Sequence, residues 1–485
     1  VNHSEFLEIN EDMFRNTKLV YDAWGSFSQL DLNSKGIKYI GLGALSSDTD
    51  AGLASSWWLK SPGEFKMISI NDIRNKKFNL CVIGMGRIGL PLAISFAKKG
   101  VNVLGRETNK EILDKINRGE SPFFEKDMGV AFNQALKKKT ITFDSDNDRT
   151  IQKCEIIIIA VGTPLRENLL PDMSIINNVI EEVCGKAKDN SIIILRSTLA
   201  PGTTEKQILP KILEINNTLN FAICPERIVE GMAMEEIERI PEIIGIDDLK
   251  IGDVVKELFL ILGNKEITIT DTKTAETAKI FANVFRYVNF ALANEFALIC
   301  EDMQVNAHEA IILANKDSRS GIPNPGPAGG PCLHKDGHFL GNTSFLNLIK
   351  TAWLLNESIP THIINTIEKQ VGPIFGKTIG VLGRSYKANI DDMRDSLAIK
   401  LIEELETKQA KVISFEPNDS NSNSLEDVLK SEIVILAVNH SEFLEINEDM
   451  FRNTKLVYDA WGSFSQLDLN SKGIKYIGLG ALNNG

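Results

Sequence analysis

The stretch KKFNLCVIGMGRIGLPLAISFAKKGVNVLGRETN (Lys76–Asn109) decides the fold. A short apolar run leads into a glycine-rich turn, an amphipathic segment and a second apolar run. This order predicts a strand, a turn, a helix and a parallel strand. Gly84, Gly86 and Gly89 form a GxGxxG sequence in the turn, where glycines permit a tight bend and let a pyrophosphate approach the helix N-terminus. The stretch therefore predicts a dinucleotide-binding unit.

An acidic residue, Glu107, stands at the predicted end of the second strand. Its carboxylate is placed to bind the hydroxyl groups of an adenosine ribose and to repel a 2′-phosphate, which favours NAD over NADP. The neighbouring Arg106 is the one feature that argues against this preference. The alternative interpretation is an α/β turn that binds no cofactor.

The same alternation continues outward from this stretch. The segments CEIIIIAVGTP, SIIILRSTLAPGTTE and FAICPERIVEG are apolar runs that end in polar turns, so residues 67–270 are expected to form one domain with a parallel sheet. From Lys273 to Asp302 the sequence lacks Gly and Pro and has helical periodicity, which predicts one long helix. A Gly/Pro-rich loop, Ser318–Gly330, follows it.

A second strand–loop–helix–strand pattern begins at GKTIGVLGRSYKANIDDMRDS. We therefore expect an α/β fold with two Rossmann-like domains joined by a long central helix: residues 67–270, a central helical part at 271–368 and a second domain at 369–485. Two such domains leave a cleft, where ligands usually bind. The central helix is also suited to a dimer interface.

Residues 1–45 repeat residues 438–482 exactly, with a junction at residues 46–66. Repeat proteins carry several diverged units at short periods, so we interpret this duplicated N-terminal extension as a partial gene duplication, a gene fusion or an artefact. Met67 is then the expected original start. The second copy is expected to occupy the native position because it follows its natural lead-in, SLEDVLKSEIVILA. The first copy would expose apolar surface or exchange with the second.

Composition excludes several classes of function. The net charge of −12 argues against nucleic acid and anionic membranes as partners, and no apolar run is long enough to span a bilayer. The six cysteines are scattered and the six histidines lack metal-ligand spacing, so we expect neither disulfides nor a metal site. A reducing, cytoplasmic location is expected.

Three groups of residues are candidates for chemistry. Cys332 lies in the loop PGPAGGPCLHKDG, where a thiol near Lys335 is either an activated nucleophile or a buried cysteine. Lys279 and Asn283 are one helical turn apart, so they either stabilise an oxyanion together or lie on a solvated helix face. Glu226 and Arg227, which follow a predicted strand, are either catalytic groups or a surface salt bridge.

Several motifs together resemble the UDP-glucose/GDP-mannose dehydrogenase family, from Lys76 to the end of the chain. In order they are GMGRIGLP, AVGTP, STLAPGTTE, CPERIVEG, AETAKIFANVFR, GGPCLHKD and YKANIDDMRDS. The long-helix segment, CPERI and FEPN are most similar to the UDP-N-acetyl-D-mannosamine dehydrogenases. The resemblance implies an NAD-dependent oxidation of C6 of a UDP-sugar to a carboxylate, through a thioester on a cysteine, by a homodimer or higher homo-oligomer.

The resemblance also implies roles for individual residues. Cys332 would be the nucleophile, Lys279 and Asn283 would stabilise the oxyanion, and Asp336 and Glu226 with Thr198 would organise water and protons. The expected NAD contacts are Gly84, Gly86, Arg87, Ile88, Gly89, Glu107, Thr163 and Thr198. The expected nucleotide-sugar contacts are Arg227, Ile228, Lys279, Asn283, Arg286, Gly329 and Lys387, with Arg319 reaching in from a neighbouring subunit.

Three features depart from the family pattern. Glu107 replaces a usual Asp, the loop from Arg319 to Cys332 is one residue shorter, and Trp461 stands where a basic residue often helps to bind the uridine diphosphate. The last two leave the substrate open. The alternatives are a UDP-glucose 6-dehydrogenase, a one-step alcohol dehydrogenase that would not need Cys332, and a non-catalytic nucleotide-sugar-binding protein.

Overall fold

The computed structural model describes residues 19–22, 32, 37–41, 67–145, 148–341 and 347–481. The chain divides into two units, Val1–Pro62 and Gly63–Gly485. Each unit is described by itself, and the second contains every motif of the predicted site.

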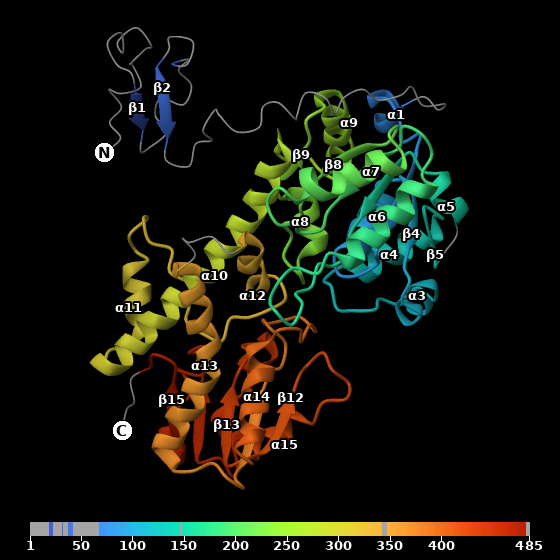
Figure 1. The fold of residues 1–485 in the computed structure, drawn as a ribbon. Helices are drawn as coiled ribbons and strands as arrows, with labels where there is room; N and C mark the ends of the chain where they lie inside the picture. Colours follow the sequence, from blue (N-terminus) through green and yellow to red (C-terminus); the bar gives the residue numbers. More distant parts are fainter. Residues whose placement is uncertain are drawn as a thin grey trace. The chain divides into compact units, whose positions relative to one another are not determined.

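An eight-stranded sheet forms the first domain of the larger unit, with strand order β10-β9-β8-β7-β6-β3-β4-β5 (Figure 1). Neighbouring strands are parallel except at β8 and β9, which meet antiparallel at Ile223 and Gly245. The strands are β3 (Asn79–Ile83), β4 (Asn102–Arg106), β5 (Ile141–Asp144), β6 (Ile156–Ile159), β7 (Ile192–Leu195), β8 (Asn220–Ile223), β9 (Glu242–Gly245) and β10 (Ile267–Thr270).

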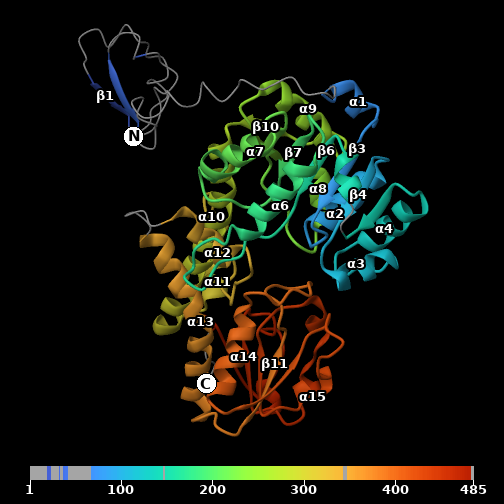
Figure 2. The ribbon, with the colours of Figure 1, turned by 45° about the vertical axis from the view of Figure 1, so that its right-hand side comes forward.

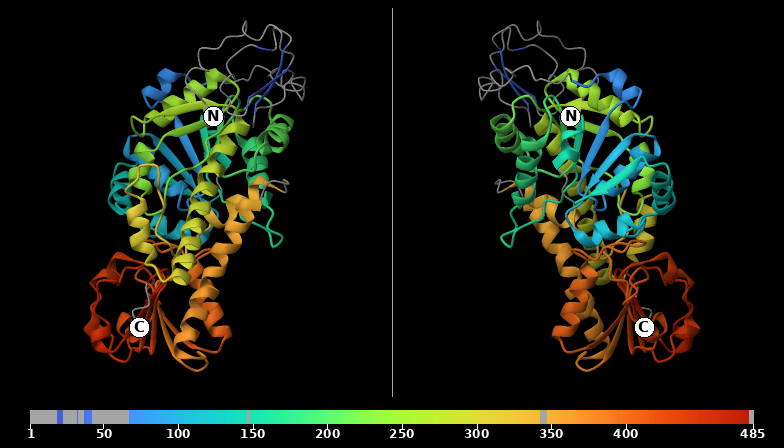
Figure 3. Two further views of the ribbon diagram at one scale, coloured as in Figure 1. Left: turned by 90° about the vertical axis from the view of Figure 1, so that its left-hand side faces the viewer. Right: turned by 90° about the vertical axis from the view of Figure 1, so that its right-hand side faces the viewer.

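Helices cover both faces of this sheet (Figure 3). Successive strand residues alternate between two cores: Leu80 and Val82 pack into one, and Cys81 and Ile83 into the other. A sheet buried on both faces needs continuous apolar runs, which explains IIII and IIIL in the sequence. The helices are α1 (Ile70–Arg74), α2 (Gly89–Lys98), α3 (Lys110–Asn117), α4 (Met128–Lys137), α5 (Asp148–Gln152), α6 (Ser174–Lys186), α7 (Leu209–Ile215), α8 (Ala233–Arg239) and α9 (Leu249–Leu260), with a π-helical turn, Thr204–Ile208, before α7.

The predicted long helix is α10 (Thr272–Met303), 32 residues in length (Figure 2). The Asp271 side chain caps its start by accepting a hydrogen bond from Thr274 N, and Gln304 ends it in the left-handed region. Ala275 near its start packs in a core of the first domain, whereas Ala297 packs in a core of the second. One continuous helix therefore belongs to both domains.

The second domain contains a five-stranded, fully parallel sheet, with order β12-β11-β13-β14-β15. Its strands are β11 (Thr378–Leu382), β12 (Lys411–Phe415), β13 (Ile433–Leu436), β14 (Leu456–Asp459) and β15 (Lys475–Gly478), and its α-helices are α14 (Leu397–Thr407) and α15 (Leu425–Leu429). Short 3-10 helices lie at Ser441–Glu445, Glu448–Met450 and Asn470–Lys472. Two α/β sheets, the first mainly and the second fully parallel, joined by α10 confirm the predicted fold class.

Shorter helices connect α10 to the second domain: α11 (Ala307–Ala314), α12 (Leu333–Asp336), a 3-10 turn at Gly337–Leu340 and α13 (Asn347–Val371). The expected boundary after residue 368 falls inside α13, which continues to Val371. In the part of the chain that is described, no helix combines the length and apolarity needed to cross a membrane.

The two copies of the repeated segment form the same strand pair. In the first copy, β1 (Leu19–Asp22) and β2 (Lys38–Gly41) are parallel, with Leu19 opposite Lys38. The second copy pairs the equivalent residues, Leu456 and Lys475, in β14 and β15. There β14 also pairs with β13, a strand that precedes the repeated sequence and is not duplicated. The junction at residues 46–66 lies outside the described residues.

Deletion of residues 1–66 should leave the unfolding temperature and NAD affinity unchanged, because both large sheets and α10 lie beyond Met67. Thermal unfolding and NAD titration measure this. Deletion of residues 438–485 together with residues 1–45 is the control, and it should abolish folding of the second domain by removing β14 and β15. A loss of NAD binding on N-terminal deletion alone would contradict the prediction.

Candidate active site

The glycine turn after β3 has the shape of a dinucleotide cradle. Gly84 has φ +90°, and a Cβ at Gly89 would lie 1.8 Å from Gly84 O, so backbone geometry excludes side chains at both positions. A Cβ at Gly86 would meet nothing within 4 Å. The open space at Gly86 adjoins the start of α2, whose N-cap residue, Ile88, makes no side-chain capping bond within the described structure. These features fit a bound pyrophosphate.

Glu107 lies at the end of β4, as expected, and is held by the backbone. Its Oε2 accepts a hydrogen bond from Met85 N at 2.8 Å and its Oε1 accepts one from Asn109 N at 2.7 Å. Arg106 is buried and forms an ion pair with Glu182 of α6. Because its guanidinium is engaged there, Arg106 does not favour a 2′-phosphate, and the residues present fit NAD.

The ends of β6 and β7 are joined beside this cradle. The buried Thr163 donates its hydroxyl hydrogen to Thr198 O at 3.0 Å, and Ser197 donates to Val161 O at 2.5 Å. The loop after β7 is then fixed to α10 by Glu276, a buried carboxylate that accepts hydrogen bonds from Gly202 N and Thr204 N. Burial raises the pKa of Glu276.

The structure brings the cysteine loop to the predicted face of α10. Asn283 Nδ2 donates to Asp336 Oδ2 at 2.6 Å, and Lys335 Nζ donates to Asp336 Oδ1 at 3.1 Å. Arg286 donates to Asn283 Oδ1 at 2.5 Å. Lys279, Asn283 and Asp336 are all buried, so the solvated-face alternative for Lys279 and Asn283 is wrong.

Cys332 differs from the other five cysteines, which are buried or half-buried. It lies exposed at the start of α12, so the buried-cysteine alternative is wrong. Close protein packing and the negative charge of Asp336 nevertheless raise the pKa of its thiol, while Lys279 and Lys335 act in the opposite direction. The expected activation of the thiol by its neighbours is therefore not present in this structure.

Glu226 lies in a buried ion network rather than at the surface. Arg196 donates to its Oε2 through two guanidinium nitrogens, and Arg227 N and Ile228 N donate to its Oε1. Burial alone would raise the pKa of Glu226, but Arg196 and the backbone hydrogen bonds hold it below its usual value. The surface-salt-bridge alternative is wrong, and the expected role in handling water or protons stays a prediction.

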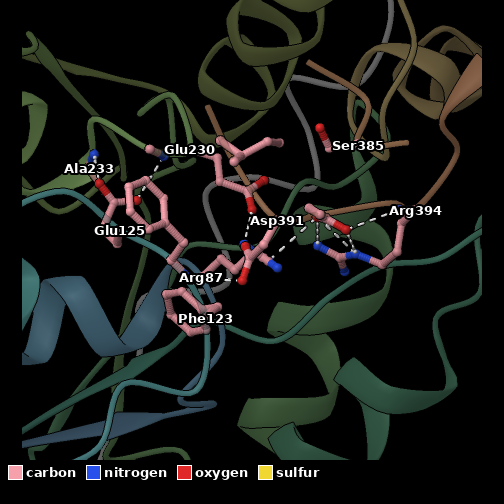
Figure 4. A network of polar contacts seen from close by, with 12 residues as sticks. Arg87, Phe123, Glu125, Glu230, Ala233, Ser385, Asp391 and Arg394 are labelled. Atoms are coloured by element: carbon pink, nitrogen blue, oxygen red, sulfur yellow. Dashed lines mark hydrogen bonds and ion pairs between the residues drawn. The ribbon is translucent and has the colours of Figure 1, made fainter. Parts of the chain in front are cut away.

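An ion cluster joins the NAD cradle to the second domain (Figure 4). Arg87 pairs with Glu230 and with Asp391, each at 2.5 Å, and its guanidinium lies 5.1 Å from the Phe123 ring centroid. Asp391 also accepts a hydrogen bond from Phe124 N at 2.8 Å. Arg87, expected to contact NAD, is thus also a contact between domains.

Sequence reasoning gave no role to several residues of this cluster. Glu230 accepts a hydrogen bond from the Tyr386 hydroxyl at 2.8 Å, and burial raises its pKa. Asp392 pairs with Arg394 at 2.6 Å. All four residues lie in the motifs CPERIVEG and YKANIDDMRDS, so the motifs located them but their spacing did not reveal the contacts.

The remaining predicted substrate contacts have varied surroundings. Lys387 donates to the Glu230 carbonyl, Arg227 donates to Pro241 O at 3.4 Å, and Gly329 packs against Asp395 O. Arg319 is different, because its side chain is 86% exposed and pairs with Asp317. Among the residues the structure describes, no cluster of three or more acidic, histidine or cysteine side chains could hold a metal ion.

Comparison with known proteins gives one consistent result. Residues 78–262, 273–357 and 380–466 match the NAD-binding, central and UDP-binding domains of the UDP-glucose/GDP-mannose dehydrogenase family. The chain is 31% identical to a UDP-N-acetyl-D-mannosamine dehydrogenase from Methanocaldococcus jannaschii, over 83% of this chain and 96% of that protein.

Solved structures agree with this match. The structure of a UDP-D-ManNAc dehydrogenase from Pyrococcus horikoshii has a TM-score of 0.77 and 30% identity, covering 84% of this chain and all of that one. A UDP-N-acetyl-mannosamine dehydrogenase from Staphylococcus aureus has a TM-score of 0.74 and 28% identity, covering 83% of this chain and 98% of that one.

Alkylation of Cys332 by iodoacetamide in the ligand-free protein should reach half its maximal rate above about pH 8.5, the ordinary thiol pKa, because close protein packing and Asp336 raise the pKa of Cys332. Asp336→Asn should move this midpoint to lower pH, and Lys335→Met should move it to higher pH. Mass spectrometry of the Cys332 peptide measures the rate, with the buried Cys81 as an internal control. A wild-type midpoint below neutral pH would contradict the prediction.

Proposed function

Because the chain belongs to the UDP-glucose/GDP-mannose dehydrogenase family, we propose that it oxidises C6 of UDP-N-acetyl-D-mannosamine to a carboxylate, forming UDP-N-acetyl-D-mannosaminuronate. The chain is an NAD-dependent oxidoreductase of UDP-sugars. Relatives and solved structures that carry the name of this mannosamine dehydrogenase, at about 30% identity over nearly their whole length, support the substrate.

One contact carries the proposal for the reaction: Asn283 of α10 bonds to Asp336, one helical turn after Cys332. It holds a nucleophile, a carboxylate and an amide in one place. When bound at the glycine turn and Glu107, NAD⁺ would supply the hydride acceptor for each of the two oxidations, so two would be reduced per product. The first oxidation turns the alcohol into an aldehyde and releases a proton.

Cys332 is needed at the second oxidation. Its sulfur adds to the aldehyde carbon as the carbonyl oxygen gains a proton, which forms a thiohemiacetal. Loss of a hydride from its carbon and of the hydroxyl proton then gives a thioester. Water attacks the thioester carbon, the carbon–sulfur bond breaks, and the carboxylate, the free thiol and a proton are formed. Because the pKa of Cys332 is raised, its proton must be removed as the sulfur attacks.

Lys279 and Asn283 would stabilise the negative oxygen of each tetrahedral adduct. The ammonium of Lys279 supplies positive charge close to Cys332, as its effect on the thiol pKa shows. Asn283 is oriented by Asp336 at one amide hydrogen and by Arg286 at its carbonyl oxygen. The second hydrogen of the Asn283 side-chain amide would then donate to an oxyanion.

A neighbouring subunit would complete the site. Arg319 lies exposed in its own chain, which suits a side chain that acts in the next subunit. One face of α10 exposes apolar side chains at helical spacing: Phe281, Phe285, Leu292, Ile299 and Met303. We propose that two chains associate through this face.

All six cysteines are free, which supports a reducing, cytoplasmic setting.

NADH release against a panel of UDP-sugars tests the proposal. UDP-N-acetylmannosamine should give a higher kcat/KM than UDP-glucose or UDP-N-acetylglucosamine, because the named relatives act on the mannosamine sugar. All three substrates carry the same UDP group, so a difference in kcat/KM between them reflects the sugar alone. A higher value for UDP-glucose would reject the substrate, and no turnover of any sugar would reject the activity.

A further inference from the structure

Trp461, which follows β14, contacts the glycine loop that leads to Cys332. The indole Nε1 donates to Ala437 O at the end of β13, at 2.9 Å, and Trp461 N donates to Asp459 Oδ1 at 2.9 Å. These two bonds fix the ring relative to the second sheet. The ring carbons lie against Gly326, where an added Cβ would be 2.5 Å from Trp461 Cε3.

Gly326 is also held by α10. Asn294, a fully buried residue of α10, accepts a hydrogen bond from Gly326 N at 2.8 Å and donates one to Gly326 O at 3.1 Å. The Asn294 amide also donates to Asn356 Oδ1 of α13 at 2.9 Å. Gly326 is therefore clamped between an amide of α10 and an indole of the second domain.

Packing explains the glycine at this position. Gly326 is not among the described glycines with positive φ, so its backbone conformation would accept a side chain, and the indole is what excludes one. Gly330, nearer to the cysteine, has φ +104°, so its backbone as well as a neighbouring ring disfavours a side chain. A Cβ at Gly330 would lie 2.5 Å from Tyr386 Cδ2, and Gly330 N donates to Asp395 O at 2.8 Å.

We propose that Trp461 is a positioning residue for the nucleophile. By pressing the loop onto Asn294 at Gly326, its indole sets where Cys332 lies relative to Lys279 and Asn283, which α10 also carries. The inference deepens the proposed function and rests on it.

Trp461→Ala should change kcat and the alkylation rate of Cys332 but not the affinity for UDP. Without the indole, the loop should hold Cys332 less well in place. Because misplacement of a reacting group slows the reaction, kcat should fall by roughly tenfold to a hundredfold. Alkylation of Cys332 by iodoacetamide should accelerate several-fold as the loop loosens. The affinity for UDP alone, measured by calorimetry, should not change. Trp461→Phe, which keeps a ring against Gly326, should restore most of kcat.

Gly326→Ala tests the same contact from the opposite side. Its new Cβ overlaps the indole, so the single variant should impair kcat and accelerate alkylation as Trp461→Ala does. In the double variant Trp461→Ala/Gly326→Ala, the indole that the new methyl group would overlap is absent. Gly326→Ala should therefore change kcat and alkylation little beyond Trp461→Ala alone, and this non-additivity identifies the contact. Phe451→Leu is the control, because Phe451 packs in the core on the other face of the sheet and should lower stability without changing alkylation.

The outcomes separate the alternatives. Weaker UDP binding with an unchanged alkylation rate would make Trp461 a nucleotide contact and overturn the proposal, as would independent, additive effects of the two substitutions. Alkylation and UDP binding need no turnover. The clamp can therefore be tested even if the wild-type protein oxidises none of the sugars, in which case only the proposed function fails.

Discussion

The rest of the structure depends on α10 being continuous through two hydrophobic cores. Ala275 packs in the first domain and Ala297 in the second, so neither domain can turn relative to the helix without losing buried contacts. Three buried polar residues along it bind other segments: Glu276 holds the loop after β7, Asn283 holds α12, and Asn294 holds the glycine loop. A single rigid element thus sets the distance between the hydride-acceptor side and the nucleophile side of the site.

Opposing influences act on the Cys332 thiol. Lys279 and Lys335 favour the thiolate, whereas close protein packing and the carboxylates of Asp336 and Glu230 favour the thiol, and the thiol prevails. A protonated cysteine is a poor nucleophile. In the proposed reaction, attack by the Cys332 sulfur is therefore coupled to removal of the thiol proton. The proposed reaction therefore depends more on where Cys332 lies than on a lowered pKa of its thiol.

Local patterns predicted those features that local geometry determines. The glycine turn, Glu107 at the end of β4, and Lys279 and Asn283 on one helix face follow from spacing along a strand or helix. Contacts between distant segments did not follow. CPERIVEG left a surface salt bridge open for Glu226 because its partner Arg196 lies 30 residues away, at the end of β7, and the ion pair of Arg87 with Asp391 joins segments about 300 residues apart. The boundary expected after residue 368 stays a prediction, and the sequence around it did not reveal that α13 continues to Val371.

The central claim is that Cys332 carries the sugar as a thioester. Rapid acid quenching of the protein during turnover, followed by intact-mass measurement and peptide mapping, tests it most directly. The account predicts a mass increase equal to the oxidised nucleotide sugar, located on the peptide that contains Cys332 and removed by mild base. The Cys332→Ala protein should bind the same substrate and show no adduct. Turnover by that variant at the wild-type rate, or an adduct on any other residue, would contradict the account.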